Sequence, residues 1–284
     1  MSRKGGKLRL VTYMCPSHPV ELYELLMSYL EETLDCEATL MYESRSGGGP
    51  LPDREDPFTD NSIDIAFMTS SALVKLLDAK NQFIELLPVA AVFKHPRNKD
   101  NSTGYYSDVI IHIDCKKHVK EFLDLRGCRW AYSDNDSLSG STIVLKTLRE
   151  LGENATFFGN TMKSGSHLAS VQMVLQKQAE AAAVDSNTLA YNKVHLQDRG
   201  KDLFVLDSLG PLPPYPIVVN TRLPGELKSK LSAAFLKLTG TRLWGERISK
   251  FGVIEFRKNN IDEYERVRDL KESVKNVGIG IQYY

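Results

Sequence analysis

The sequence predicts an α/β fold with two lobes, each a mainly parallel sheet flanked by helices. Short apolar strands alternate with amphipathic helices along the chain, which is the pattern of parallel sheets. At 284 residues the chain is long enough for two compact lobes rather than one. Polar stretches near 95–106 and 207–216 contain proline and glycine and mark two crossovers between lobes. We therefore expect a discontinuous first lobe, residues 1–98 and 213–284, and an inserted second lobe, residues 99–212.

The elements of the first lobe follow from apolar periodicity. Leucines and a tyrosine recur three and four residues apart between 20 and 34, which predicts an amphipathic helix. Strand-length apolar runs occupy residues 8–14, 37–42, 63–67, 86–93 and 217–219. Further helices are expected at about 68–77, at 227–238 and in the polar tail 261–274, and the segment 44–58 is expected to be a loop.

The second lobe repeats the alternation. Strands are expected at 109–113, 128–132, 181–184 and 203–206. Helices are expected at 119–125, 142–151 and 168–178, and another begins at 185–187. In an open parallel sheet, ligands bind at the carboxyl ends of the strands, so the turns that follow these strands are the candidate sites.

One of these turns, residues 134–142, carries three hydroxyl side chains around a glycine, and we call it the serine turn. It lies between a predicted strand and a predicted helix, and a helix start offers unpaired N–H groups and a positive dipole end to an oxyanion. Ser137, Ser139 and Ser141 add hydroxyl donors, and Gly140 allows close backbone approach. The alternative is that one serine only caps the helix. Three serines around one glycine favour an anion site as strongly as a cap.

Composition limits the class of protein. Lysine plus arginine equals aspartate plus glutamate, 36 against 36, which argues against a general nucleic-acid or membrane-surface binder. No apolar run is long enough to cross a membrane, and no cleavable export signal precedes the first strand. We therefore expect a cytoplasmic protein with reduced thiols. The four cysteines lack metal-ligand spacing, and we expect neither a metal nor a cofactor.

Several motifs together resemble a known family. The motifs are Asp136-Ser-Leu-Ser-Gly140, Ser164-Gly-Ser-His167, Ala181-Ala-Ala-Val-Asp185-Ser-Asn187, and shorter stretches at 64–67, 122–127, 223–227 and 264–270. In this order and spacing, over most of residues 8–270, they resemble the phosphonate-binding branch of the type II periplasmic binding proteins. The chain would be a cytosolic member of that branch.

The resemblance implies a two-lobed clamp around a phosphonate, a phosphate or a similar small anion. Ser137 and Ser139 match the family's hydroxyl positions, whereas Leu138 stands where a threonine is usual. His167 matches a ligand position at a helix start. Asp185 faces the place where the family often binds the other end of the ligand.

Other candidates come from the remaining strand ends. Thr69 and Ser70 open a helix and would face the serine turn if the lobes close. Tyr105, beside Tyr106 at the first crossover, would supply an aromatic wall, although tyrosines there are as often hinge packing. Tyr42 would supply a wall from the inserted loop region, with Arg45 as a charge.

These observations predict a binding protein that closes by hinge motion on a small phosphonate- or phosphate-like anion held between the lobes. One alternative is a cytosolic enzyme on the same fold that acts on a small phosphorylated or carboxylated metabolite. Cys15 with His18, or His167, would then perform the chemistry, since a thiolate–imidazole pair activates a cysteine. No orienting residue is evident, and a buried thiol with a surface histidine is the commoner arrangement. A third alternative is an interaction or sensory module that has lost its ligand.

Overall fold

The computed structural model describes residues 5–13, 18–43, 47–275 and 277. They form two compact units. The first comprises the described residues up to Lys94, with Asp100–Gly104 and Pro213–Glu265. The second comprises His95–Lys99, Tyr105–Leu212 and the described residues from Arg266 onward. Among the described residues, no helix is long and apolar enough to cross a membrane.

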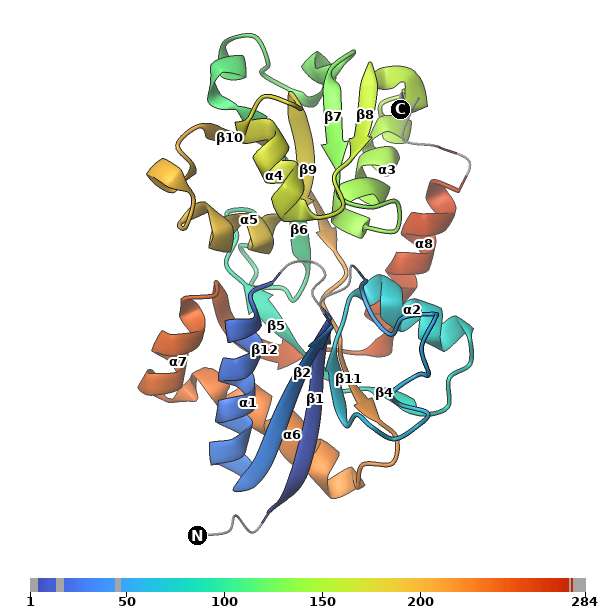
Figure 1. Cartoon of the computed structure of the whole chain (residues 1–284), viewed down its shortest axis with the longest axis vertical. Coiled ribbons are helices and arrows are strands. Elements are labelled where there is room, and N and C mark those ends of the chain that lie inside the picture. The colour runs from blue at the N-terminus through green and yellow to red at the C-terminus, as the bar shows by residue number, and fades with distance from the viewer. Residues whose placement is uncertain (1–4, 14–17, 44–46, 276, 278–284) are drawn as a thin grey trace. The chain divides into compact units, whose positions relative to one another are not determined.

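The first unit is built on a five-stranded sheet, most of whose strands are labelled in Figure 1. Its strand order is β2 (Cys36–Glu43), β1 (Gly5–Tyr13), β3 (Ile65–Phe67), β11 (Ile217–Asn220), β4 (Ile84–Leu86). The strand β1 runs parallel to both of its neighbours, and β11 runs antiparallel to both of its own. Four strands therefore point the same way and β11 is reversed.

The core of the first unit lies on one face of this sheet. Helix α1 (Val20–Leu34) turns its apolar residues, among them Leu26 and Leu30, into this core. Helices α6 (Gly225–Lys237) and α7 (Arg242–Ser249) add Phe235 and Trp244, and a ribbon of β5 (Val89–Phe93) and β12 (Val253–Lys258) extends it. Helix α2 (Ser70–Asp78) follows β3 and buries Leu73 and Val74 outside that cluster.

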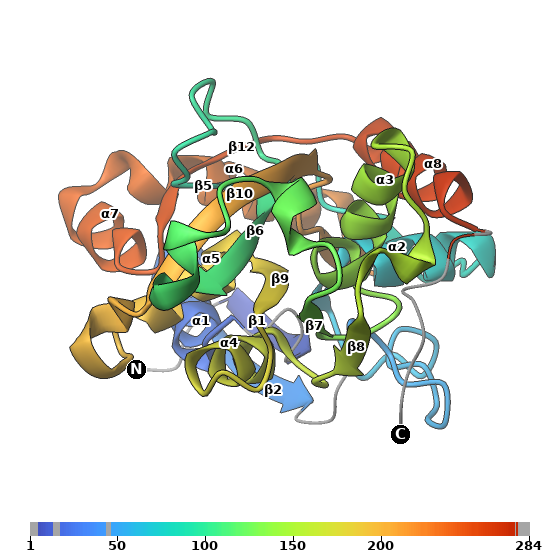
Figure 2. The same ribbon diagram turned by 90° about the horizontal axis from the view of Figure 1, so that it is seen from above.

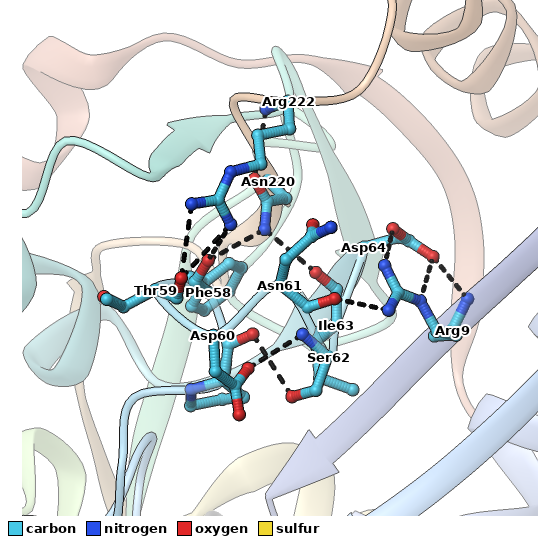
Figure 3. Close-up of polar contacts among 11 residues, drawn as sticks. Arg9, Phe58, Thr59, Asp60, Asn61, Ser62, Ile63, Asp64, Asn220 and Arg222 are labelled. Atoms are coloured by element: carbon cyan, nitrogen blue, oxygen red, sulfur yellow. Dashed lines mark hydrogen bonds and ion pairs between the residues drawn. The ribbon is translucent and has the colours of Figure 1, made fainter.

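Polar contacts fix the start of β3, as Figure 3 shows. The backbone N–H and the Nε of Arg9 both donate to Asp64 Oδ2, at 2.8 and 2.9 Å, and Nη2 donates to Oδ1 at 2.7 Å. The Asp64 carboxylate raises the pKa of Arg9. Asn220, at the end of β11 on the other side of β3, donates through its Nδ2 to the carbonyls of Phe58 and Ile63, both at 3.1 Å. These bonds tie the loop before β3 to β1 and β11, so the role of Asp64 is structural.

The second unit has its own five-stranded sheet. The strand order is β10 (Leu203–Leu212), β6 (Tyr105–His112), β9 (Ala181–Asp185), β7 (Arg129–Tyr132), β8 (Asn160–Lys163). The strands β7, β8 and β9 are mutually parallel, whereas β6 is antiparallel to both β9 and β10. The carboxyl ends of β7, β8 and β9 therefore meet at one edge of the sheet.

Helices cover both faces of this sheet. Helix α3 (Ile143–Glu150) follows β7, and α4 (His167–Leu175) follows β8. Figure 2 shows these two helices on opposite sides of the strands, as right-handed crossovers in opposite directions require. Helix α5 (Ser186–Lys193) follows β9 directly.

The predicted fold class is confirmed, with local differences. Residues 119–125 form only a short 3₁₀ turn, Phe122–Leu125. The strands β8 and β12 and the helix α7 were not predicted, and the single strand predicted at 86–93 is two strands, β4 and β5. The first lobe was expected to include all of 213–284, but α8 (Glu265–Ser273) groups with the second unit from Arg266 onward. Arg149 of α3 donates to the Ser273 carbonyl and Arg266 donates to the Pro211 carbonyl, which attaches this helix there.

Candidate functional site

The serine turn forms a single π-helical turn, Leu138–Thr142, between β7 and α3. Ser137 caps it: its Oγ accepts the N–H of Gly140 at 2.9 Å, and its carbonyl accepts the N–H groups of Ser141 and Thr142 at 3.1 and 3.0 Å. Ser137 is thus a helix cap, as the alternative reading of the sequence expected. Its hydroxyl hydrogen remains available for donation, because the oxygen acts only as an acceptor in this bond.

Two backbone N–H groups at the start of this turn have no acceptor among the described residues. In the part of the chain that the structure describes, the N–H groups of Leu138 and Ser139 donate to no other group. The carbonyl of Ser139 is held on the other side by Ser107 of β6, whose Oγ donates to it at 2.6 Å. Ser107 is fully buried, so it fixes the orientation of this peptide from inside the sheet. Ser107 was not among the predicted site residues.

Gly140 lies where no side chain fits. A Cβ at this position would lie 2.3 Å from Ser133 Oγ, 3.0 Å from Ser137 Oγ and 3.3 Å from His167 Cε1. Its backbone φ is not in the left-handed region, so the reason for glycine here is close packing rather than backbone conformation. Three polar side chains therefore converge on this point of the turn.

Three helices start at the same edge of the sheet. The serine turn leads into α3, Ser166 caps α4 by accepting the N–H of Ala169 at 3.0 Å, and Asp185 caps α5 by accepting the N–H groups of Asn187 and Thr188, both at 2.9 Å. Each helix start carries a partial positive charge from its dipole. Because β7, β8 and β9 are parallel neighbours, these partial charges lie at one edge.

His167 and Asp185 lie behind the serine turn in a buried network. His167 is only 2% exposed, and Asp185 is fully buried. The Nε2 of His167 lies 3.4 Å from Ser139 Oγ, and its Nδ1 accepts the backbone N–H of Asp185 at 3.3 Å. The structure thus brings these two predicted residues together with the turn. Both are part of its support, and Leu138 and Ser141 are buried within the turn itself.

Three further polar groups at this edge were not predicted as site residues. Ser133 Oγ, Ser186 Oγ and Asn187 Nδ2 are buried and have no hydrogen-bond partner among the described residues. A buried polar group without a partner costs free energy, so such groups are expected where a ligand supplies the missing bond. The signal in the sequence is their position: Ser133 directly follows β7, and Ser186 and Asn187 directly follow β9.

The lysine beside the turn is paired with an aspartate. Lys163, at the end of β8, lies 2.6 Å from Asp134 Oδ2, and this carboxylate raises the pKa of the lysine. An anion at this edge would therefore be held by neutral donors and helix dipoles. Among the described residues, no cluster of histidine, cysteine and acidic side chains could hold a metal.

Thr69 and Ser70 belong to the first unit, at the start of α2. Thr69 caps this helix by accepting the N–H of Ala72 at 3.2 Å, and Ser70 is buried. The backbone of Gly48 packs against Thr69, whose N–H donates to the Gly48 carbonyl at 2.8 Å. Tyr42 is 62% exposed on β2, the outer strand of its sheet. Arg45 lies outside the described residues.

The two tyrosines of the first crossover, Tyr105 and Tyr106, are buried by packing rather than exposed as an aromatic wall. Tyr105 is buried at the start of β6, opposite Leu212 in the register with β10. Tyr106 stacks on His95 with ring centroids 4.4 Å apart, and its hydroxyl donates to the Arg97 carbonyl at 3.2 Å. This agrees with the packing role that the sequence left open for these residues.

His18 was expected at the surface, and this expectation is wrong. The residue is 6% exposed, because its ring packs against Tyr215 and Phe93 at centroid distances of 4.8 and 5.4 Å. Its Nδ1 lies 3.4 Å from the Tyr23 hydroxyl. These aromatic rings, together with Phe67, border a small apolar cavity of about 40 Å³. Cys15, its predicted catalytic partner, lies outside the described residues.

Comparison with known proteins identifies the family of the chain. Residues 10–264 match the model of the family described as "ABC transporter, phosphonate, periplasmic substrate-binding protein". The chain belongs to this family. The predicted resemblance of the chain to the phosphonate-binding branch is thereby confirmed. Membership also supports, at the level of the family, the prediction of a binding protein for a small anion. No curated protein matches the chain in sequence.

Solved structures share the fold at low sequence identity. A binding-protein component of an ABC phosphonate transporter from Pseudomonas aeruginosa has a TM-score of 0.74 at 15% identity, covering 97% of this chain and 91% of that one. A methylphosphonate-bound protein from Prochlorococcus marinus has a TM-score of 0.72 at 14% identity, covering 95% and 99%. The aliphatic sulphonate-binding protein of Escherichia coli has a TM-score of 0.62 at 13% identity, covering 96% and 94%.

The family corrects the expected location. We expected a cytoplasmic protein from the lack of an export signal before the first strand, and this expectation is wrong. The family consists of periplasmic substrate-binding proteins. Membership over residues 10–264 therefore assigns the chain to a periplasmic class rather than to the cytoplasm.

Proposed function

We propose that this protein binds a small oxyanion carrying a phosphonyl or phosphoryl group at the serine turn. The observation that carries this proposal is the set of donors at one sheet edge. These are the free N–H groups of Leu138 and Ser139, the hydroxyls around Gly140, and three helix starts. An oxyanion is the ligand that satisfies such an arrangement, since it accepts several hydrogen bonds and is attracted by the positive ends of helix dipoles.

The relatives agree with this ligand class. One similar structure holds methylphosphonate, another belongs to a phosphonate transporter, and a third binds aliphatic sulphonates. All three ligand descriptions share a tetrahedral group with several acceptor oxygens. Leu138 supplies a backbone N–H but no hydroxyl, so the turn offers fewer side-chain donors than a serine–threonine–serine sequence would.

We further propose that the two predicted lobes close on this ligand by hinge motion, with Thr69, Ser70 and Tyr42 of the first unit completing the site. The chain passes between the units at 94–95, 99–100, 104–105, 212–213 and 265–266. Polar contacts stiffen the second unit beside these passages. Arg97 Nη2 donates to Asp207 at 2.7 Å, and Asp108 accepts from Ser208 Oγ at 2.6 Å. Hinge closure is absorbed by a few loop or element-terminal residues, so a stiff segment beside the passages would confine the rotation to them.

Titration calorimetry with methylphosphonate, inorganic phosphate and methanesulphonate tests the binding proposal. The variants Ser137→Ala and Ser139→Ala are each expected to weaken binding of the preferred anion about 10- to 100-fold, the usual effect of a hydrogen bond to a charged group. Ser229→Ala, on the exposed surface of α6, is the matched control and is expected to bind normally. Unchanged affinity in the double variant Ser137→Ala/Ser139→Ala would exclude the serine turn as the site.

Small-angle scattering tests the closure proposal separately. With saturating methylphosphonate, the radius of gyration is expected to fall, since a ligand shifts the population toward the state with which it makes more contacts. Identical scattering curves with and without bound ligand would refute closure while leaving the anion site intact.

A further inference from the structure

The hydrogen bonds of His167 determine which of its ring nitrogens carries a hydrogen. A backbone N–H can only donate, so the bond from the Asp185 N–H makes Nδ1 an acceptor. A neutral imidazole with an unprotonated Nδ1 carries its hydrogen on Nε2. The ring is buried, at 2% exposure, between the end of β9 and the serine turn, so this arrangement is shielded from water.

The Nε2 hydrogen in turn fixes the hydroxyl of Ser139. The hydroxyl oxygen of Ser139 lies 3.4 Å from Nε2. When this oxygen accepts the Nε2–H, its own hydrogen must point away from the ring. Ser107 holds the carbonyl of the same residue from the other side, at 2.6 Å. Both polar ends of Ser139 are therefore oriented by buried neighbours.

We propose that His167 is a positioning residue that acts through Ser139: as a neutral ring with its hydrogen on Nε2, it turns the Ser139 hydroxyl into a dedicated donor for a ligand oxygen that carries no proton. This inference rests on the proposed anion site and differs from the expectation that His167 itself contacts the ligand. The buried position of the ring and its two bonds to protein groups support it.

Two amide replacements test the bond to Ser139 and the bond from the Asp185 N–H one at a time. His167→Gln places an amide N–H₂ near the position of Nε2 and keeps the donor to Ser139. His167→Asn places its amide oxygen near the position of Nδ1, which keeps the acceptor for the Asp185 N–H but loses the donor. If His167 acts through Ser139, methylphosphonate affinity stays within about threefold of wild type in His167→Gln and falls about tenfold in His167→Asn.

A double-mutant cycle then distinguishes positioning from direct contact. A residue that acts only through Ser139 has nothing further to lose once the hydroxyl is gone, so Ser139→Ala/His167→Asn is expected to bind methylphosphonate as Ser139→Ala does. Additive losses would mean that His167 contacts the ligand and would overturn the inference, while the serine turn would remain the site. If wild type bound none of the three anions, the proposed function itself would fail.

The tautomer of His167 can also be measured directly in the ligand-free wild-type protein, so this test does not depend on a variant that folds. Long-range proton–nitrogen correlation spectra of the imidazole distinguish the two neutral tautomers of His167. The expected spectrum is that of the ring with hydrogen on Nε2 near neutral pH. A spectrum with hydrogen on Nδ1, or on both nitrogens, would contradict the bond from the Asp185 N–H and overturn the inference.

Discussion

Replacing Gly140 by alanine is the smallest change that should disable the serine turn. The added methyl carbon would lie 2.3 Å from Ser133 Oγ and 3.0 Å from Ser137 Oγ, so both hydroxyls must move. Overpacking of this kind costs about 1–3 kcal/mol of folding free energy. Displacing the Ser137 cap also tilts the peptide groups of Leu138 and Ser139, the two free backbone donors. We therefore expect the affinity for methylphosphonate to fall about 10- to 100-fold.

The assay is titration calorimetry, with chemical denaturation of the same samples to measure stability. Gly225→Ala is the matched control, because nothing lies within 4 Å of a Cβ there and its φ is likewise outside the left-handed region. It should leave the affinity unchanged and should not lower the stability, since Gly→Ala at a compatible helical position stabilises by about 0.4–1 kcal/mol. Ser133→Ala removes the nearest clashing atom, so Gly140→Ala/Ser133→Ala should recover part of the lost stability. Wild-type affinity in Gly140→Ala would refute the argument that the packed turn forms the site.

Three further predictions concern the structure around the site. Asp64→Ala removes the acceptor of three Arg9 donors and should lower the free energy of unfolding by about 1.5–3 kcal/mol in urea titrations. The control Glu226→Ala, in an exposed pair with Lys230, should leave the free energy of unfolding unchanged. Tyr29→Phe loses the bond from the hydroxyl to the Ala234 carbonyl and should cost about 1 kcal/mol in the same measurement, and an equal cost for Tyr42→Phe, whose side chain is exposed, would contradict the assignment to that bond. Burial raises the pKa of Cys128 from 9.0 to about 12, so the contribution of its neutral thiol to stability is complete below pH 9.0 and is lost as the pH rises toward 12. In Cys128→Ala the free energy of unfolding should therefore fall less between pH 9.0 and 12 than in wild type. An unchanged pH profile would show that the thiol is not buried.

The sequence predicted those features that depend on local pattern. Helix α1 was predicted with its observed bounds, because its leucines recur at helical spacing. The serine turn was found because strand, hydroxyls, glycine and helix are contiguous in the chain. The strand β8, Asn160-Thr-Met-Lys163, was missed because only Met162 in it is strongly apolar, and parallel pairing with β7 decides its conformation.

The buried residues that hold the serine turn in place could not be predicted from local pattern. Ser107 is 32 residues from Ser139, and it reaches that carbonyl because the sheet order places β6 next to β9, which is itself next to β7. His167 was predicted as a ligand residue by resemblance, yet its two bonds run to protein groups from two other elements. His18 was expected at the surface because nothing near it in sequence indicates the ring of Tyr215.

The most direct test of the anion site is a crystal structure of the protein grown with methylphosphonate. We expect a phosphonate oxygen within hydrogen-bond distance, about 2.7–3.0 Å, of Ser139 Oγ and of the N–H groups of Leu138 and Ser139. The His167 ring should keep its bonds to Ser139 and to the Asp185 N–H. Methylphosphonate bound at any other place, with the serine turn occupied only by water, would contradict the account.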